Sequence, residues 1–240
     1  PVSVDYVITS EGPGTSACTG NSVTKTVVVE PTIEVTASGE TICEGGTTNI
    51  DVETVFSGNN GQEYTWTVAA PADVTGWSDG PADGQAFDVN ITQTLNNSAT
   101  TPQTVTYTIT GYTTDGSGNL LCAGTPLDVD VIVEPDIEVT ASDKTICSNE
   151  STDLDVNTIF AGSVGEKYSW TVTAPASVTG ASDGPVDGQA FNTNIDQTLV
   201  NTSSSQQVVT YTISGYTTNA SGNLVCAGTP LTVDVTVEPV

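Results

Sequence analysis

VTYTI, from Val105 to Ile109, returns unchanged at Val209 to Ile213, which lies 104 residues further along the chain. Within this stretch valine, tyrosine and isoleucine alternate with threonine. Such a period of two is typical of a strand with one buried face, and β-branched and aromatic residues favour strands. The stretch therefore predicts two copies of one β-structure.

Other segments recur at the same spacing. They are IEVTAS at Ile33 and Ile137, TIC at Thr41 and Thr145, DGQAF at Asp83 and Asp187, and CAGTPL at Cys122 and Cys226. A fixed period is the signature of a tandem array. It predicts complete repeats at residues 32–135 and 136–240.

The N-terminal segment follows the same spacing, because Cys18-Thr-Gly and VTKTVVVEP align with the sequence that begins at Cys122. Residues 1–31 are therefore predicted to be the C-terminal part of a preceding, truncated repeat. A partial sandwich leaves its inner face without a partner. Two explanations stay open: the chain belongs to a longer array, or another subunit completes the broken sandwich by adding strands.

Short alternating segments fill each repeat and are separated by clusters of Gly, Asn, Asp and Pro, such as SGNNG and SDGPADG. Several short strands in about 100 residues are typical of a two-sheet sandwich. A single proline, Pro31 or Pro135, marks each junction and restricts the backbone there. The predicted fold class is all-β, with tandem Ig-like β-sandwich repeats in a semi-rigid linear array.

The chain is strongly acidic, with 29 Asp and Glu, three Lys and a net charge of −26. Nucleic-acid backbones are excluded as partners because phosphate binding needs clustered Lys and Arg. No run of residues approaches the roughly 18 apolar residues of a membrane helix, so no membrane insertion is expected. Such a charge needs screening by counterions or divalent cations.

Catalytic residues are not expected. The chain has no histidine and its three basic residues are all lysines, Lys25, Lys144 and Lys167. A Ser-His or Cys-His nucleophile cannot be assembled without histidine, and no glycine-rich phosphate loop is present. The prediction is that the chain is not an enzyme.

The five cysteines have no accompanying histidine or CxxC pair, so disulfides in an oxidising compartment are expected rather than zinc. Pairing within repeats gives Cys43–Cys122 and Cys147–Cys226, and leaves the partner of Cys18 outside the chain. That pairing is the prediction. In a standard Ig topology, however, the first-hairpin loop and the last-hairpin loop lie at opposite ends of the domain, which weakens it. Pairing across the junctions, as Cys18–Cys43 and Cys122–Cys147, is the alternative.

Two sets of carboxylates are candidate Ca²⁺ ligands, since calcium prefers several oxygen ligands. The first set lies in the SDGP–DGQ loops and comprises Asp79, Asp83, Asp183 and Asp187. Turn chemistry alone also accounts for these Asp-Gly pairs. The second set, Glu134, Asp136 and Glu138, crowds around the proline at the junction. Calcium is predicted to rigidify the array.

Trp77 stands apart from the other tryptophans, because its counterpart in the next repeat is Ala181. Trp66 and Trp170 recur within alternating strands and are predicted core residues. A residue present in one copy alone is a candidate surface contact, for a glycan or a neighbouring filament. Local packing within the loop is the alternative.

Together the elements TIC-x-G, YTWTV, ITQTL-x-N, VTYTITG and C-x-GTP-x-x-VDVxVEP resemble the PKD-like/Ig-like repeats of giant secreted surface proteins of the Bacteroidetes. The resemblance implies a structural segment of an adhesin or filament on a bacterial cell surface. Its partners would be adjacent repeats or neighbouring subunits of the same protein. The WDFGDG signature of PKD domains is replaced by YTWTVAAP and YSWTVTAP. A carbohydrate-binding accessory module of a secreted polysaccharide-degrading enzyme, with surface glycans as partners, is the alternative.

Overall fold

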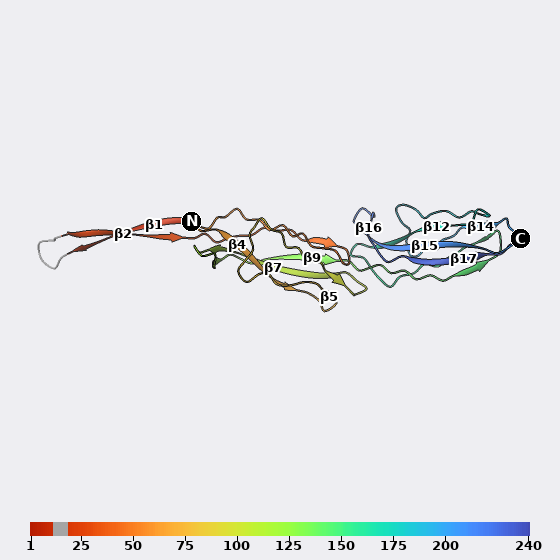
Figure 1. Cartoon of the computed structure of the whole chain (residues 1–240), viewed down its shortest axis with the longest axis horizontal. Coiled ribbons are helices and arrows are strands. Elements are labelled where there is room, and N and C mark those ends of the chain that lie inside the picture. Colours follow the sequence, from red (N-terminus) through yellow and green to blue (C-terminus); the bar gives the residue numbers. More distant parts are fainter. Residues whose placement is uncertain (12–18) are drawn as a thin grey trace.

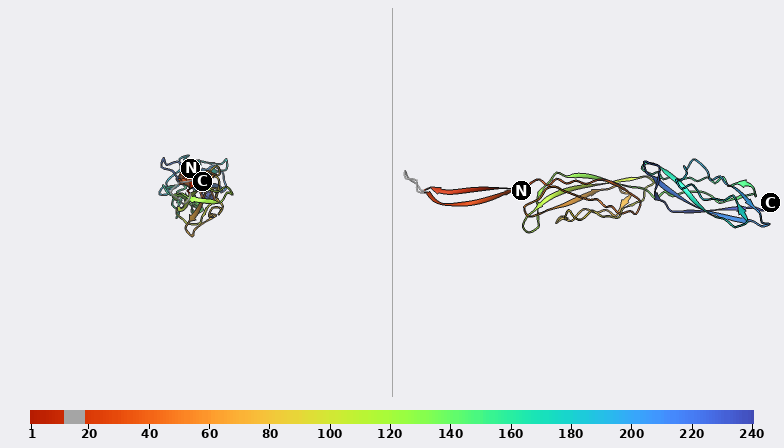
Figure 2. Two further views of the ribbon diagram at one scale, coloured as in Figure 1. Left: turned by 90° about the vertical axis from the view of Figure 1, so that its left-hand side faces the viewer. Right: turned by 90° about the horizontal axis from the view of Figure 1, so that it is seen from above.

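A computed structural model describes residues 1–11 and 19–240. It is elongated, with a narrow hairpin at one end and two β-rich bodies following one another along the long axis (Figures 1 and 2). The described residues contain strands and no helix, and so no helix long and apolar enough to cross a membrane. The predicted all-β class with tandem β-sandwich repeats is confirmed.

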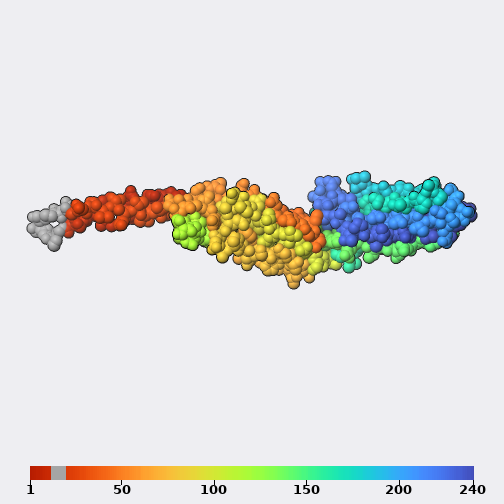
Figure 3. All heavy atoms as spheres, in the orientation of Figure 1, coloured from red at the N-terminus to blue at the C-terminus, as the bar shows by residue number. Residues whose placement is uncertain are grey.

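The N-terminal hairpin consists of β1 (Val2–Glu11) and β2 (Thr19–Val29), paired antiparallel. In the space-filling view it forms a thin arm ahead of the first body (Figure 3). The predicted disulfide residue Cys18 lies outside the described residues.

The first complete repeat, for which the sequence predicts residues 32–135, has its main sheet in the order β3-β9-β7-β4, with β8 paired to β7. Strands β5 and β6 form a separate two-stranded sheet. The strands are β3 (Glu40–Ile42), β4 (Gln62–Ala69), β5 (Val74–Thr75), β6 (Asn96–Asn97), β7 (Gln103–Thr114), β8 (Leu120–Ala123) and β9 (Leu127–Val133).

The second complete repeat, for which the sequence predicts residues 136–240, has the same plan. Its main sheet runs β10-β17-β15-β12 with β16 paired to β15, and β11-β14-β13 form the smaller sheet. The strands are β10 (Lys144–Ile146), β11 (Glu150–Ser151), β12 (Glu166–Thr173), β13 (Val178–Thr179), β14 (Thr198–Asn201), β15 (Gln207–Thr218), β16 (Leu224–Ala227) and β17 (Leu231–Val237).

The direction of two short strands positions the cysteines. Strand β3 runs parallel to β9, with Ile42 opposite Val133, so β3 ends where its repeat ends. Strand β8 pairs with the far end of β7, with Leu120 opposite Thr114. Because β7 runs antiparallel to β9, β8 lies at the beginning of the repeat. The first repeat therefore carries β3 at its end and β8 at its beginning. The second repeat likewise carries β10 at its end and β16 at its beginning.

Each repeat has its own core, built from the inward positions of the alternating strands. Tyr107 and Ile109 are fully buried, and Trp66 is 7% exposed, as is Trp170 in the second repeat. The predicted core position of both tryptophans is confirmed. The Tyr107 hydroxyl donates to Gln93 Oε1 at 2.9 Å, which satisfies the one polar group that this ring buries.

We expect the fold to lose stability in alkaline solution. Burial raises the pKa of Tyr107 and of Tyr211 to about 12, whereas an unfolded tyrosine ionises near 10. The native state therefore keeps a proton that the unfolded state releases, so this stabilisation is complete below about pH 10 and is lost between about pH 10 and pH 12. Each tyrosine is expected to cost about 1–2 kcal/mol in that window, after allowance for solvent screening.

Urea unfolding at about pH 8 and about pH 11 measures this loss. In Tyr107→Phe the first repeat keeps the ring at this position but lacks its ionisable hydroxyl, so the pH dependence of the first repeat should be smaller than that of the second repeat, which keeps Tyr211. An equal alkaline loss in the variant and the wild type would contradict the assignment.

The outward face of the main sheets explains how so acidic a chain folds with three lysines. Thr106 Oγ1 donates to Asp130 Oδ1 and Thr108 Oγ1 donates to Asp128 Oδ1, both at 2.7 Å across β7 and β9. Among the described residues the one ion pair joins Lys144 and Asp153 at 3.8 Å. Cross-strand threonines, rather than cations, are the partners of these carboxylates.

Candidate functional site

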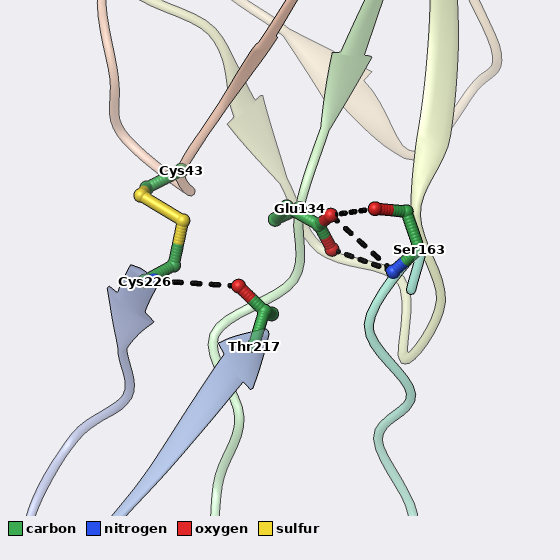
Figure 4. Close-up of a disulfide and its surroundings, with 5 residues drawn as sticks. All are labelled: Cys43, Glu134, Ser163, Thr217 and Cys226. Carbon is green, nitrogen blue, oxygen red and sulfur yellow. Dashed lines mark hydrogen bonds between the residues drawn. A yellow bond between two sulfur atoms is a disulfide. The ribbon is translucent and has the colours of Figure 1, made fainter. Parts of the chain in front are cut away.

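The junction between the two complete repeats is closed by a disulfide between Cys43 and Cys226 (Figure 4). The two Cα atoms lie 5.4 Å apart although the residues are separated by 183 positions in the sequence. Cys43 directly follows β3, and Cys226 lies in β16, where its N–H donates to Thr217 Oγ1 at 3.3 Å. The bond therefore ties the end of one sandwich to the beginning of the next.

The predicted disulfides within repeats, Cys43–Cys122 and Cys147–Cys226, are wrong. Cys43 and Cys122 lie at opposite ends of one sandwich, because β3 is parallel to the last strand and β8 pairs with the far end of β7. Among the described cysteines Cys122 and Cys147 are free and exposed. The alternative pairing of Cys122 with Cys147 is not formed either, since these residues lie at the two outer ends of the pair of repeats.

Glu134 forms the second link across the junction. Its carboxylate accepts hydrogen bonds from the backbone N–H of Ser163, 3.0 Å from Oε2, and from the Ser163 hydroxyl. Its own N–H donates to Ile42 O at 2.8 Å. The side chain is only 2% exposed, so a carboxylate of the first repeat is buried against a loop of the second (Figure 4).

We expect Glu134→Ala to weaken the junction by about 1–3 kcal/mol, because it removes the charged acceptor of the Ser163 N–H and hydroxyl. Glu134→Gln keeps one acceptor oxygen and should cost less. The matched control is Glu138→Ala, since Glu138 is exposed and lies in the same linker. Urea unfolding measures both losses, and equal values for Glu134→Ala and Glu138→Ala would contradict a role for the buried carboxylate.

The same contact recurs at the preceding junction. Glu30 Oε2 accepts a hydrogen bond from the N–H of Asn59 at 2.9 Å, and these residues are the repeat counterparts of Glu134 and Ser163. The sequence gives no signal for this contact, because the donor is a backbone group and its side chain changes from Asn to Ser. The glutamate contact of the N-terminal hairpin with the first repeat therefore repeats the glutamate contact of the first repeat with the second.

Two further contacts complete the junction. The N–H of Ala161 donates to Thr100 O at 2.9 Å, from a loop of the second repeat to a loop of the first. Asp136 accepts from the N–H and the hydroxyl of Thr229 at 2.8 and 2.7 Å, which fixes the linker on its own repeat. Pro135 is buried between these contacts.

The predicted calcium ligands do not converge. Asp79 Oδ1 accepts from the N–H of Val68 at 2.8 Å, and Asp183 makes the equivalent bond to Val172, while Asp83 is exposed. In residues 1–11 and 19–240 no group of three or more Asp, Glu or Cys side chains is arranged to hold a metal ion. At the junction, Glu134 accepts hydrogen bonds from Ser163 and Asp136 accepts them from Thr229, while Glu138 is exposed. Calcium binding stays a prediction.

Trp77 lies on the surface of the first repeat with 40% of its area exposed. Its Nε1 donates to Val74 O at 3.1 Å, so the indole is held against its own loop by one edge. Its counterpart Ala181 is partly buried and packs against the second core. The indole face is therefore available for a contact that the second repeat cannot make.

The comparisons with known proteins bear on the repeats themselves. A family described as "PKD-like domain" matches residues 40–137 and again residues 144–240. No curated protein matches the sequence. One solved structure, described as the D0-D1 domain of Intimin, is similar over 85% of this chain and 95% of that chain, with 13% identity and a TM-score of 0.25.

Proposed function

The chain belongs to the PKD-like domain family, and from that premise we propose that it is a structural segment of an extracellular surface fibre or adhesin stalk. In this role the repeats set the length and stiffness of the stalk, and binding to a target belongs to other parts of the protein. The role is mechanical rather than catalytic.

The observation that carries the proposal is the disulfide between Cys43 and Cys226. The junction has two covalent connections, the linker at Pro135 and this bond, and the buried contact of Glu134 with Ser163 lies beside them. Two connections restrict both bending and rotation, whereas a single linker would allow a hinge. A catalytic or ligand-binding domain has no need of such a restraint between neighbours, but a load-bearing stalk does.

The disulfide also supports the proposed location. Structural disulfides persist outside the cytosol and in secreted proteins, because cytosolic thiol systems keep cysteines reduced. A net charge of −26 favours solubility and discourages side-by-side association. A position on a bacterial cell surface is the part of the proposal that rests on the sequence resemblance.

Immuno-electron microscopy of the source cells tests the proposal. Antibodies raised against this chain are expected to label thin fibres that project from the cell surface. Label confined to the cytoplasm, or to a soluble secreted enzyme, would sink the proposal. Small-angle scattering of the purified chain gives a second check, since a restrained junction predicts one extended shape that shortens or broadens after reduction.

Calcium stiffening is a separate part of the proposal. Bound calcium at Asp79, Asp83 or the junction carboxylates would raise the melting temperature by mass action. The measurement compares melting in EDTA with melting in millimolar Ca²⁺, with Mg²⁺ as the control for simple charge screening. Equal melting temperatures in EDTA, Ca²⁺ and Mg²⁺ would contradict the proposal that calcium stiffens the array.

A carbohydrate-binding module is the second candidate, and the exposed indole of Trp77 is the observation that favours it. Sugar rings stack on exposed aromatic faces. A glycan array with the wild-type chain and Trp77→Ala distinguishes the two functions, provided that both melt at the same temperature. Reproducible sugar binding that is lost in the variant favours the module, and absence of binding in both favours the stalk.

A further inference from the structure

We propose that the bond between Cys43 and Cys226 is one link of a continuous covalent ladder along an array of PKD-like repeats. In this ladder Cys147 is bonded to the CAGTP-type cysteine of the following repeat, and Cys122 to the TIC-type cysteine of the preceding repeat. The inference rests on the proposed stalk only in requiring a neighbouring repeat.

Cys147 is the counterpart of Cys43 and occupies the same place on its sandwich. Strand β10 pairs in parallel with β17, with Ile146 opposite Val237, as Ile42 is opposite Val133. The N–H of Glu238 donates to Ile146 O at 2.9 Å, which reproduces the bond from Glu134 to Ile42. Cys147 is thus presented at the outer end of the second complete repeat, beside the next Val-Glu-Pro motif.

Cys122 is the counterpart of Cys226 and is held in the same way. Its N–H donates to Thr113 Oγ1 at 3.2 Å, as that of Cys226 donates to Thr217 Oγ1 at 3.3 Å. The two sites differ in exposure, because Cys226 is 4% exposed and Cys122 is exposed. Cys226 is bonded to the TIC cysteine of its neighbour, whereas among the described residues no TIC-type cysteine lies against Cys122.

The N-terminal hairpin shows how the preceding repeat would present its cysteine. Strands β1 and β2 pair Val4 with Val27 and Ile8 with Val23, in the register in which β7 pairs with β9. The edge of β2 that corresponds to the edge of β9 bound by β3 has no strand in the described residues. A TIC-type strand on that edge would bring its cysteine beside Glu30, as Cys43 lies beside Glu134.

The apolar side chains of the hairpin show that the rest of a sandwich fits there. Val4, Tyr6 and Ile8 are 40%, 55% and 60% exposed. The residues of β7 in the same register are Val105, Tyr107 and Ile109, which are fully buried. The hairpin thus has the inner face of a sandwich without the strands that cover it, and those strands belong to the repeat that would bring the TIC-type cysteine.

Each link forms by oxidation of two thiols to one disulfide. Two protons and two electrons leave the cysteine pair, and a protein or small-molecule disulfide accepts them and is itself reduced to two thiols. In the one link that the described residues contain, the two Cα atoms lie 5.4 Å apart, which is within the range that a disulfide requires.

A chain extended by a second copy of residues 137–240 directly after Val240 tests the ladder, because this fusion keeps the 104-residue spacing. Non-reducing peptide mapping after alkylation is expected to join Cys147 to the CAGTP cysteine of the added copy, while Cys122 stays alkylated. In the 240-residue chain Cys147 should be alkylated. Cys147→Ser in the extended chain should abolish the new link and leave Cys43–Cys226 intact.

Alkylation of Cys147 in the extended, oxidised chain would contradict the ladder. A disulfide that joins Cys147 to a second, separate chain would contradict it as well. Mapping of the protein isolated from its source after thiol blocking is the second measurement. There Cys122 and Cys147 should both resist alkylation, and a peptide joining them to each other would contradict the proposal. If these tests fail, the ladder is contradicted, and the proposed stalk function is still tested separately by immuno-electron microscopy.

Discussion

Removing the junction disulfide with the double variant Cys43→Ser/Cys226→Ser is expected to uncouple the two complete repeats while each of them stays folded. The bond closes a loop of 183 residues. In the unfolded chain a closed loop of that size loses conformational entropy worth about 5 kcal/mol, so the wild type should resist global unfolding by about that amount more than the variant. Urea unfolding under non-reducing conditions measures the difference.

The matched control is Cys147→Ser, which makes the same chemical change in the same TIC motif at an end without a neighbour. It should leave the unfolding free energy of the 240-residue chain unchanged. Pulling on single molecules adds an independent reading, because the wild type should extend less before the bond arrests it. The coupling is contradicted if the double variant and the control unfold at the same urea concentration.

Gly124→Ala is expected to destabilise the first repeat by about 3 kcal/mol or more. A Cβ at Gly124 would lie 1.7 Å from the carbonyl oxygen of Ile33 and 2.8 Å from its carbon. These are backbone atoms of the segment that enters the repeat after Pro31, and they cannot rotate away as a flexible side chain can. This position of the CAGTP motif therefore needs glycine, because the segment that enters the repeat passes directly against Gly124.

Gly116→Ala is the matched control, since a Cβ there meets nothing within 4 Å. It should be neutral or slightly stabilising, because alanine reduces the entropy of the unfolded chain. Thermal and urea unfolding of both variants measure the effect. The close-contact explanation is contradicted if Gly124→Ala has the same melting temperature as the wild type. It is also contradicted if Gly228→Ala in the second repeat, where the nearest backbone oxygen would lie 2.2 Å from the Cβ, does not lower the melting temperature.

Much of the fold could be predicted from the sequence because its signals are local. The alternation around Tyr107 and Trp66 places apolar side chains on one face of a strand whatever the strand pairs with. Those residues do form the core. The repeat spacing then carries the same assignment to the other copy without further evidence, as the equal 7% exposure of Trp66 and Trp170 shows.

The site could be predicted only in part. The sequence marks the acidic linker and Pro135 as parts of the junction and the cysteines as disulfide residues, but it does not show which groups meet at the junction. Glu134 resembles any exposed linker glutamate until Ser163 is folded against it. The carboxylates chosen as calcium ligands are likewise indistinguishable by sequence from ones that accept backbone or threonine hydrogen bonds, such as Asp79 and Asp136.

The sequence by itself determined that this protein is a tandem array of β-sandwiches with a 104-residue period and without histidine-based catalysis, because composition, period and alternation are properties of the chain alone. Only the tertiary structure decided that Cys43 meets Cys226. That choice depends on β3 lying parallel to the last strand of its repeat and on β16 lying at the start of the next. Strand direction and pairing are set by contacts between residues far apart in sequence, and cysteine spacing carries no record of them.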